Sequence, residues 1–278
     1  MAGFTGKIAV VTGAGGTLCS LLSERLAEAG AKVILVGRTR EKLDVVAERI
    51  RAFGGVCAVK CCDATDEAAV QGIADEVFSE FGPCDLLLNG AGGNSADATT
   101  KKEAFTEDEF EPGATPGFFD LSLDAVRRVL DVNTLGTVIP CRVFGAQMAK
   151  ADGGAILNFA SMNTYKPLTK NPAYAMAKAA VSNFTEWLAA YLAPAGIRVN
   201  AVAPGFFLNE RSQKFLLTPE GTCSPRGEKV MAHTPMKRFG EAEDLWGTVE
   251  WLLDDEKSAF VTGVTVPVDG GFIAHPGV

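Results

Sequence analysis

The sequence has 278 residues, a formal net charge of −8 at pH 7 and an apolar content of 47%. Such an acidic chain lacks the cationic face that general nucleic-acid binding needs, and its apolar content excludes extensive disorder. No apolar run approaches the ~18 residues of a transmembrane helix, and the start lacks the basic region of a signal peptide. The two histidines, His233 and His275, support no metal site. We therefore expect a cytoplasmic protein with no metal and with no membrane or nucleic-acid partner.

Short apolar runs alternate with helical patterns along the chain. The expected strands are residues 7–12, 32–36, 56–61, 85–89, 154–159, 198–203 and 264–268. The expected helices are residues 18–29, 41–53, 66–81, 123–150, 172–192 and 241–253. Wholly apolar strands that alternate with helices indicate a parallel sheet covered on both faces. The expected fold class is therefore α/β, with residues 1–278 forming a single Rossmann domain around a doubly wound sheet of about seven strands.

Two long segments interrupt this alternation and carry opposite charge. Residues 97–124 contain eight acidic residues and two lysines, a net charge of −6. Residues 211–238 contain six basic residues and two glutamates, a net charge of +4. Long loops in a compact domain tend to be functional. We expect residues 97–124 and 206–238 to cover a substrate, and two solvated surface loops are the alternative.

The first expected strand ends in a glycine-rich turn that is typical of dinucleotide binding. Glycines allow a pyrophosphate to approach the backbone N–H groups at the start of the following helix. The pattern is imperfect because Leu18 stands where GxGxxG requires glycine, so a plain tight turn is the alternative. The residues expected to bind the phosphates are Gly13, Gly15, Gly16, Thr17 and Leu18.

The residue after the second expected strand bears on the choice of cofactor. An NAD enzyme usually places a carboxylate there, which binds the ribose 2′-hydroxyl. Here the strand is followed by Arg38, with Arg40 and Lys42 close by. A guanidinium suits a 2′-phosphate through charge-assisted bonds, so NADP(H) is favoured over NAD(H). The alternative is that Arg38 stacks on the adenine, which either cofactor would allow.

The clearest chemical pattern lies after the fifth expected strand. Tyr174 and Lys178 are four residues apart on one helix face, and Ser161 comes thirteen residues before Tyr174. A tyrosine hydroxyl with a pKa near 10 is a weak base at neutral pH, and a neighbouring ammonium favours its phenolate form. A serine hydroxyl can hold and polarise a carbonyl oxygen. This set suits hydride and proton transfer between a ketone and an alcohol.

These residues resemble the signature of the short-chain dehydrogenase/reductase family, which is a serine, twelve residues, a tyrosine, three residues and a lysine. The resemblance covers nearly the whole chain. It implies that Tyr174 is the general acid/base, with Ser161 and Lys178 as partners, and that Asn133 is the fourth catalytic residue and supports a proton relay to Lys178. It also implies cofactor contacts from Asp63, Ala64, Asn89, Gly90, Ala91, Gly92, Tyr174, Lys178, Pro204 and Gly205.

The cofactor turns depart from the family pattern at three positions. The family turn reads Thr-Gly-x-x-x-Gly-x-Gly, and Thr17 and Cys19 stand at its later glycine positions. The family's Asn-Asn-Ala-Gly has Gly90 in place of its second asparagine. Cys19 is small enough for a close approach of the helix, and Thr17 can offer a hydroxyl to a phosphate. We therefore expect cofactor binding to be retained.

Within the family, the chain resembles the branch described as D-mannonate oxidoreductase or fructuronate reductase. The resemblance lies after Gly93-Asn94, in residues 204–208 and 233–236, and in the ending 270–278. It implies that D-fructuronate, a sugar-acid anion, is reduced to D-mannonate or formed from it, in carbohydrate metabolism. Candidates for binding its carboxylate are Arg211, Lys214, Lys170 and Lys166, and candidates for its hydroxyls are Asn94 and Asn163.

Other functions remain open on the same residues. A gluconate 5-dehydrogenase-like or 3-ketoacyl reductase-like enzyme would use the same catalytic set, and an apolar pocket would favour the ketoacyl substrate. A non-catalytic dinucleotide sensor is a third interpretation, which the intact set of four catalytic residues disfavours. The family resemblance also implies a homo-oligomer, often a tetramer, in which residues 123–150 and 174–192 pair across a two-fold axis.

Overall fold

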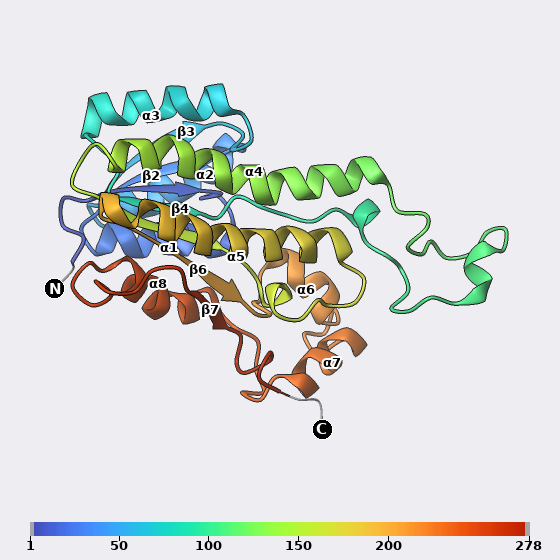
Figure 1. The fold of residues 1–278 in the computed structure, drawn as a ribbon. Coiled ribbons are helices and arrows are strands. Elements are labelled where there is room, and N and C mark those ends of the chain that lie inside the picture. Colours follow the sequence, from blue (N-terminus) through green and yellow to red (C-terminus); the bar gives the residue numbers. More distant parts are fainter. Residues whose placement is uncertain (1–2, 276–278) are drawn as a thin grey trace.

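The computed structural model describes residues 3–275 (Figure 1). Within this range, parallel strands form one seven-stranded sheet in the order β3-β2-β1-β4-β5-β6-β7. The strands are β1 (Ile8–Thr12), β2 (Lys32–Gly37), β3 (Val56–Cys61), β4 (Leu86–Asn89), β5 (Gly154–Phe159), β6 (Ile197–Pro204) and β7 (Thr265–Val268). The chain order reverses beside β1, where open α/β sheets form a crevice at the carboxyl ends of their strands. The predicted fold class is confirmed.

The helices expected from the sequence are present, with ends that shift by a few residues. They are α1 (Thr17–Glu28), α2 (Arg40–Ala52), α3 (Glu67–Phe81), α4 (Leu123–Met148), α5 (Pro172–Leu192) and α8 (Trp246–Leu253). A short 3-10 turn, Ala242–Leu245, precedes α8 and replaces the first turn of the helix predicted there.

The basic segment contains two helices, where the sequence predicted only a loop. They are α6 (Glu210–Leu216) and α7 (Pro225–His233). The hydroxyl of Ser224 caps α7 by accepting a hydrogen bond from the backbone N–H of Gly227 at 3.0 Å. A serine followed by proline is a common helix start. The two helices share a small buried cluster that includes Leu216 and Val230, which explains how such short helices hold together.

Alternate strand residues face two helical layers, which Figure 1 shows on either side of the sheet. On β1, Ala9 and Val11 pack in one cluster with side chains of α1, α2 and α8. Ile8 and Val10 pack in the other cluster with side chains of α3, α4 and α5. Because both faces of the strand are covered, its sequence is a continuous apolar run rather than an alternating one.

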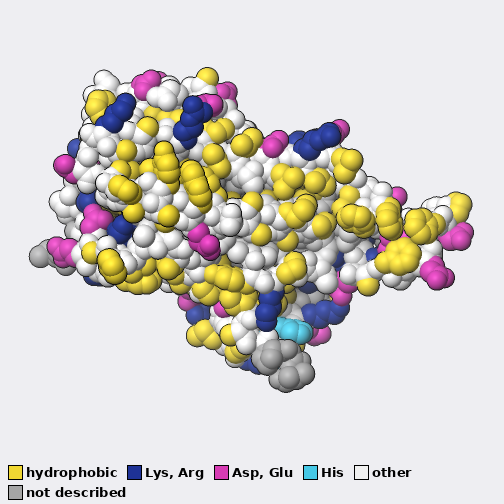
Figure 2. Space-filling model, viewed as in Figure 1, with side chains coloured by type: hydrophobic (Ala, Val, Ile, Leu, Met, Phe, Trp, Pro, Cys, Tyr) yellow, Lys and Arg dark blue, Asp and Glu magenta, His cyan; other side chains and the backbone are white. Residues whose placement is uncertain are grey.

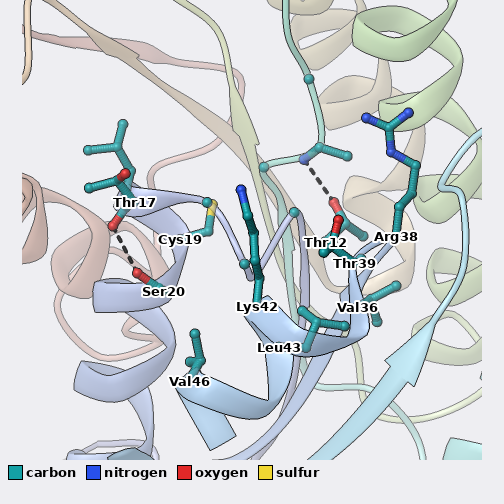
Figure 3. A pocket seen from close by; sticks show the side chains of 18 of the residues that line it. Thr12, Thr17, Cys19, Ser20, Val36, Arg38, Thr39, Lys42, Leu43 and Val46 are labelled. Carbon is teal, nitrogen blue, oxygen red and sulfur yellow. Dashed lines mark hydrogen bonds between the residues drawn. The ribbon is translucent and has the colours of Figure 1, made fainter. Parts of the chain in front are cut away.

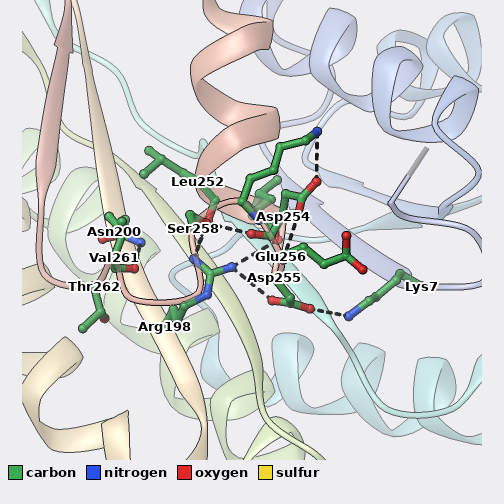
Figure 4. A network of polar contacts seen from close by, with 12 residues as sticks. Lys7, Arg198, Asn200, Leu252, Asp254, Asp255, Glu256, Ser258, Val261 and Thr262 are labelled. Atoms are coloured by element: carbon green, nitrogen blue, oxygen red, sulfur yellow. Dashed lines mark hydrogen bonds and ion pairs between the residues drawn. The ribbon is translucent and has the colours of Figure 1, made fainter. Parts of the chain in front are cut away.

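A polar network fastens the sheet at the end opposite the crevice (Figure 4). Arg198, near the start of β6, donates hydrogen bonds to the carbonyl oxygens of Leu252 and Leu253 at the end of α8. It also pairs with Asp255, whose second oxygen lies 2.6 Å from Nζ of Lys7, just before β1. The side chain of Arg198 is only 11% exposed. This network therefore ties α8 to two strands without entering the crevice.

The acidic segment forms an arm, residues 99–122, that extends beyond the helical layers (Figure 1). Its phenylalanines pack on one another but stay 58–69% exposed. They are Phe105, Phe110, Phe118 and Phe119. Figure 2 shows hydrophobic side chains on this arm and on the surface of α4 and α5. The arm is thus a second departure from a simple doubly wound domain.

No helix within residues 3–275 is long and apolar enough to cross a membrane. The cysteines at positions 19, 57, 61, 62, 84, 141 and 223 are free thiols, of which Cys19, Cys84 and Cys141 are buried. Cys61 is exposed and the other three are half-buried. These side chains therefore pack at several depths rather than forming a common cluster.

Candidate functional site

A cavity of about 830 Å³ opens at the carboxyl ends of the first strands (Figure 3). The expected cofactor residues that line it are Gly13, Gly15, Gly16, Thr17, Leu18, Arg38, Asp63, Ala64, Gly90, Ala91 and Gly92. They come from the segments that follow β1, β2, β3 and β4. Two of these turns are joined directly, because the hydroxyl of Thr12 accepts a hydrogen bond from the backbone N–H of Ala91 at 3.2 Å.

The turn after β1 presents backbone rather than side chains to the cavity. Gly13 has a φ of +67°, and a Cβ there would lie 2.6 Å from the carbonyl oxygen of Gly90. A Cβ on Gly15 would lie 2.9 Å from Cβ of Lys42. The first turn of α1, which begins at Thr17, has no side-chain cap, so its N–H groups point to an anion site. This geometry fits the pyrophosphate of a dinucleotide.

Two of the departures from the family pattern lie in contact with each other. A Cβ on Gly90 would lie 2.1 Å from Sγ of Cys19, which is 4% exposed. Gly90 has no left-handed φ, so the contact and not the backbone conformation excludes a side chain there. Burial raises the pKa of the Cys19 thiol to about 12, which keeps it neutral. The thiol therefore fills the space that a side chain at position 90 would need.

Arg38 and Asp63 face each other where β2 and β3 end. The guanidinium lies 3.7 Å from the carboxylate, and the two side chains are 69% and 41% exposed. The backbone N–H and the hydroxyl of Thr65 donate hydrogen bonds to Asp63 at 2.9 and 2.8 Å. The Thr65 N–H is the main group that lowers the pKa of Asp63. Asp63 is thus a fixed carboxylate beside a largely exposed guanidinium.

Lys178 and Tyr174 lie together at the end of β5. Lys178 is 4% exposed, and its Nζ donates a 2.6 Å hydrogen bond to the carbonyl oxygen of Phe159. The same Nζ lies 5.7 Å from the centroid of the Tyr174 ring. The hydroxyl of Thr164 donates to the carbonyl oxygen of Lys178 at 2.9 Å, which fastens α5 to the turn after β5. Burial lowers the pKa of Lys178 to about 8.

The hydroxyl of Ser161 is oriented by Asn163. Its oxygen accepts hydrogen bonds from the backbone N–H and the side-chain amide of Asn163 at 3.2 and 3.3 Å. Because the oxygen accepts both bonds, the hydroxyl hydrogen can be donated elsewhere. Asn163 is 6% exposed, and its Oδ1 accepts a further bond from the N–H of Leu168. The structure therefore places Asn163 as a support for Ser161.

Asn133 lies on α4 beside the same site. Its amide nitrogen donates to the carbonyl oxygens of Gly93 and Val129, both at 2.7 Å. A Cβ on Gly92 would lie 2.7 Å from Oδ1 of Asn133 and 3.5 Å from Nζ of Lys178. Gly92 therefore sits between Asn133 and Lys178, and these two predicted residues are close neighbours.

Five predicted cofactor residues are not among those that line this cavity: Tyr174 and Lys178, described above, and Asn89, Pro204 and Gly205. Asn89 is 1% exposed, and its amide donates a 2.9 Å hydrogen bond to Asn158 on the next strand. Pro204 ends β6, and a Cβ on Gly205 would lie 2.7 Å from Cα of Asp269. These three residues lie at the carboxyl ends of β4 and β6.

The predicted substrate residues are dispersed. Asn94 donates a 2.9 Å hydrogen bond from its amide to the side chain of Asn171, directly before α5. Arg211 lies on α6, and its side chain falls outside the described residues. Asn94 therefore contacts the N-cap residue of α5, the helix of Tyr174, whereas Asn163 contacts the hydroxyl of Ser161.

Several residues of the cavity were not predicted from the sequence. Figure 3 shows that Lys42, on the first turn of α2, points toward the cavity. The start of α6 contributes Asn209 and Glu210, and Val132 and Phe159 also line the cavity. The sequence indicated basic side chains on this side of the cavity only through the run of Arg38, Arg40 and Lys42. Nothing local in the sequence indicates that α6 reaches the cofactor side.

Residues 7–218 match the short chain dehydrogenase family. The chain belongs to this family. It is 45% identical to UxuB, an uncharacterized oxidoreductase of Bacillus subtilis, over 98% of this chain and 97% of that protein. This short-chain dehydrogenase also matches a solved Haemophilus influenzae structure with bound NAD, provisionally described as a D-mannonate oxidoreductase. That match has 42% identity and a TM-score of 0.94, and covers 99% of this chain and 97% of the other.

More distant relatives act on polyols and ketoses by name. The structure of NAD⁺-bound xylitol dehydrogenase matches with 32% identity and a TM-score of 0.84, over 96% of this chain and 99% of that one. The L-xylulose reductase of Mus musculus is 34% identical over 98% of both chains. The predictions of an enzyme and of an oxidoreductase of this family are confirmed.

Proposed function

We propose that this short-chain dehydrogenase interconverts the ketone of D-fructuronate and the alcohol of D-mannonate with a nicotinamide cofactor. The observation that carries this proposal is the ammonium of Lys178 beside the ring of Tyr174, next to a cavity shaped for a dinucleotide. The Haemophilus relative, with its description as a mannonate oxidoreductase and its bound NAD, supports the substrate and the cofactor class.

In this mechanism the cofactor supplies or accepts the hydride. During reduction, the hydroxyl of Tyr174 gives its proton to the carbonyl oxygen, and during oxidation it takes that proton back. Ser161, oriented by Asn163, donates a hydrogen bond to the same oxygen. The nearby charge of Lys178 favours the phenolate form of Tyr174. Asn133, across Gly92 from Lys178, supports the relay of the proton toward solvent.

The experiment that tests the reaction is cofactor oxidation by the purified protein. NADPH and NADH are each supplied with D-fructuronate, with a neutral ketose or with a β-ketoacyl thioester. Turnover of fructuronate alone supports the proposal. Turnover of the ketose or the thioester alone keeps the mechanism and discards the sugar acid. Bound cofactor with no turnover of any carbonyl would favour a dinucleotide sensor.

We also propose that NADP(H) is preferred to NAD(H), on the basis of Arg38 at the end of β2. Its guanidinium is 69% exposed and can bind a 2′-phosphate, although Asp63 lies 3.7 Å away. Arg38→Ala should lower the ratio of kcat/KM for NADPH over NADH by about 10-fold, because a charge-assisted bond is lost. Arg40→Ala, which removes a guanidinium paired with Asp44 on the same turn, is the matched control. A wild-type ratio of one or below contradicts the preference, and an equal ratio in the wild type and Arg38→Ala contradicts the role of Arg38.

We further propose that residues 97–124 and 206–238 cover the substrate and that the domain is a homo-oligomer. Large exposed side chains on α4 and α5 support association, namely Leu135, Trp187 and Tyr191 at 44%, 58% and 67% exposure. Light scattering of the purified protein measures the mass that tests this. A mass of a single chain at micromolar concentration contradicts it.

A further inference from the structure

One carboxylate of the arm, that of Glu103, contacts a lysine of α7 and feels the charge of two further cations. Both oxygens of Glu103 accept hydrogen bonds from Nζ of Lys229, at 3.2 and 3.1 Å. Because Lys229 lies on α7, this contact joins the arm to the basic segment. The hydrogen bond from Lys229 lowers the pKa of Glu103, and the charges of Lys170 and Arg226 lower it further. All three cations therefore act on the same carboxylate.

The side chain of Arg226 is restrained in position but has no acidic partner of its own, so it is available to bind an anion. Its guanidinium lies 5.5 Å from the centroid of the Phe215 ring, which restrains it from one side. Its Nε is buried and has no hydrogen-bond partner. Within residues 3–275, neither Arg226 nor Lys170 forms an ion pair. A half-buried guanidinium with an unmade hydrogen bond is unfavourable unless a ligand completes it.

Lys170 connects the cation group to the start of the helix that carries Tyr174. Lys170 comes directly before Asn171, the N-cap of α5, and Tyr174 follows four residues after Lys170. Because α5 begins at Pro172, Tyr174 lies in its first turn and Lys170 lies just before the helix. Lys170 has a left-handed φ of 74°, and its carbonyl oxygen accepts a 3.0 Å hydrogen bond from the N–H of Thr100 in the arm. The arm therefore fixes the backbone of Lys170, four residues before Tyr174.

We propose that Lys170, Arg226 and Lys229 form the subsite for the carboxylate of an anionic substrate, and that Glu103 occupies it when no substrate is bound. This inference rests on the proposed function, because it assigns the residues that recognise the sugar acid. Since Lys170 directly precedes the N-cap of α5 and Tyr174 lies in the first turn of that helix, the proposal puts a short carbon chain between the carboxylate and the reacting carbonyl. A neutral ketose has no group that could displace Glu103.

The Glu103–Lys229 pair is suited to being displaced. Its side chains are 47% and 67% exposed. Exposed ion pairs contribute little free energy because water screens them and two long side chains must be ordered. A substrate carboxylate that also accepts hydrogen bonds from Arg226 makes an interaction that Glu103 does not make. The arm then loses one of its ties to α7 when substrate binds.

The test measures binding rather than turnover, so that it does not depend on the reaction. D-Mannonate is titrated calorimetrically into the protein saturated with reduced cofactor, which cannot oxidise it, and D-mannitol is the neutral match. We expect Arg226→Gln to weaken mannonate binding by about 10-fold and Arg226→Lys to recover part of the loss. Arg51→Gln, which removes the same charge from the exposed end of α2, should change nothing.

Glu103 provides the opposite prediction. Glu103→Gln should tighten mannonate binding by about 3-fold, since it removes the internal competitor. Glu107→Gln on the same arm is the matched control and should leave the affinity unchanged. Lys229→Gln serves as a second subsite variant if Arg226→Gln fails to fold, which cofactor affinity and melting temperature report.

The outcomes separate this inference from the proposed function. If fructuronate is not turned over but mannonate binding depends on Arg226, the reaction is wrong and the subsite stands. If fructuronate is turned over but Arg226→Gln behaves like Arg51→Gln, only the subsite is wrong. Equal affinity of the wild type for mannonate and mannitol, or no binding of mannonate, also overturns the subsite.

Discussion

The proposed cofactor side and the proposed substrate side of this molecule are held together by different forces. On the cofactor side, turns meet so closely that a single added carbon would collide, as at Gly13 and Gly90. On the substrate side, the arm is tied through exposed polar contacts, such as that between Glu103 and Lys229. A larger side chain should therefore weaken cofactor binding in the first region, whereas a change of charge should alter substrate affinity in the second. The proposed cofactor binding therefore depends on shape, and the proposed choice of substrate depends on electrostatics.

The largest effect is expected at Tyr174, where the two regions meet. Tyr174→Phe removes the hydroxyl but keeps the ring against Lys178. We expect kcat to fall by about 10²–10⁴-fold in both directions, because the proton donor is lost. The dissociation constant of the reduced cofactor, measured by fluorescence titration, should stay nearly constant. A variant that keeps most of its kcat would assign proton transfer to another group.

A smaller effect is expected where Cys19 and Gly90 share one space. Gly90→Ala places a Cβ 2.1 Å from the Cys19 Sγ. Overpacking of this kind costs about 1–3 kcal/mol, so the cofactor dissociation constant should rise by roughly 10-fold. Adding Cys19→Gly removes the obstructing sulfur and should restore most of the affinity. The double-mutant cycle is measured by titration with reduced cofactor.

The matched control for this cycle is Gly93→Ala. A Cβ at Gly93 meets no atom within 4 Å, and its φ is not left-handed. The affinity should therefore stay close to that of the wild type. If Gly90→Ala weakens binding equally with and without Cys19, the two positions act independently and the shared-space explanation is wrong.

The sheet and the catalytic spacing could be predicted because their signals are local. Val10 and Val11 are buried on opposite faces of β1, which leaves a plain apolar run in the sequence. The four-residue spacing of Tyr174 and Lys178 follows from helix geometry alone. Any sequence that forms this helix after β5 brings the two side chains to one face.

The contacts between distant segments could not be predicted. The sequence shows Cys19 and Gly90 as two separate departures from the family pattern. Only the parallel pairing of β1 with β4 shows that the turns after these strands lie next to each other. Asn163 has the chemistry of a sugar ligand, and only the turn after β5 shows that it supports Ser161. The pairing of Glu103 with Lys229 joins two segments whose opposite charges were evident but whose contact was not.

The smallest effect concerns stability and the burial of Lys178. Burial lowers its pKa from 10.5 to about 8. Between these pH values the unfolded chain holds a proton that the folded chain has lost, so wild-type stability should rise with pH through this range. Below about pH 8 both states are charged, and the folded state carries the full cost of a buried ammonium.

Methionine keeps the length of this side chain without the charge. Lys178→Met should therefore be more stable than the wild type at pH 7, by on the order of 1–3 kcal/mol in urea unfolding without cofactor. The advantage should shrink as the pH approaches 10.5, and the exposed Lys150→Met should show no such trend. Equal destabilisation at both pH values would mean that the hydrogen bond to Phe159 outweighs the burial of charge. A gain in stability of Lys178→Met at pH 7 would instead show that the buried ammonium destabilises the fold. Its position beside Tyr174 would then be explained by proton chemistry.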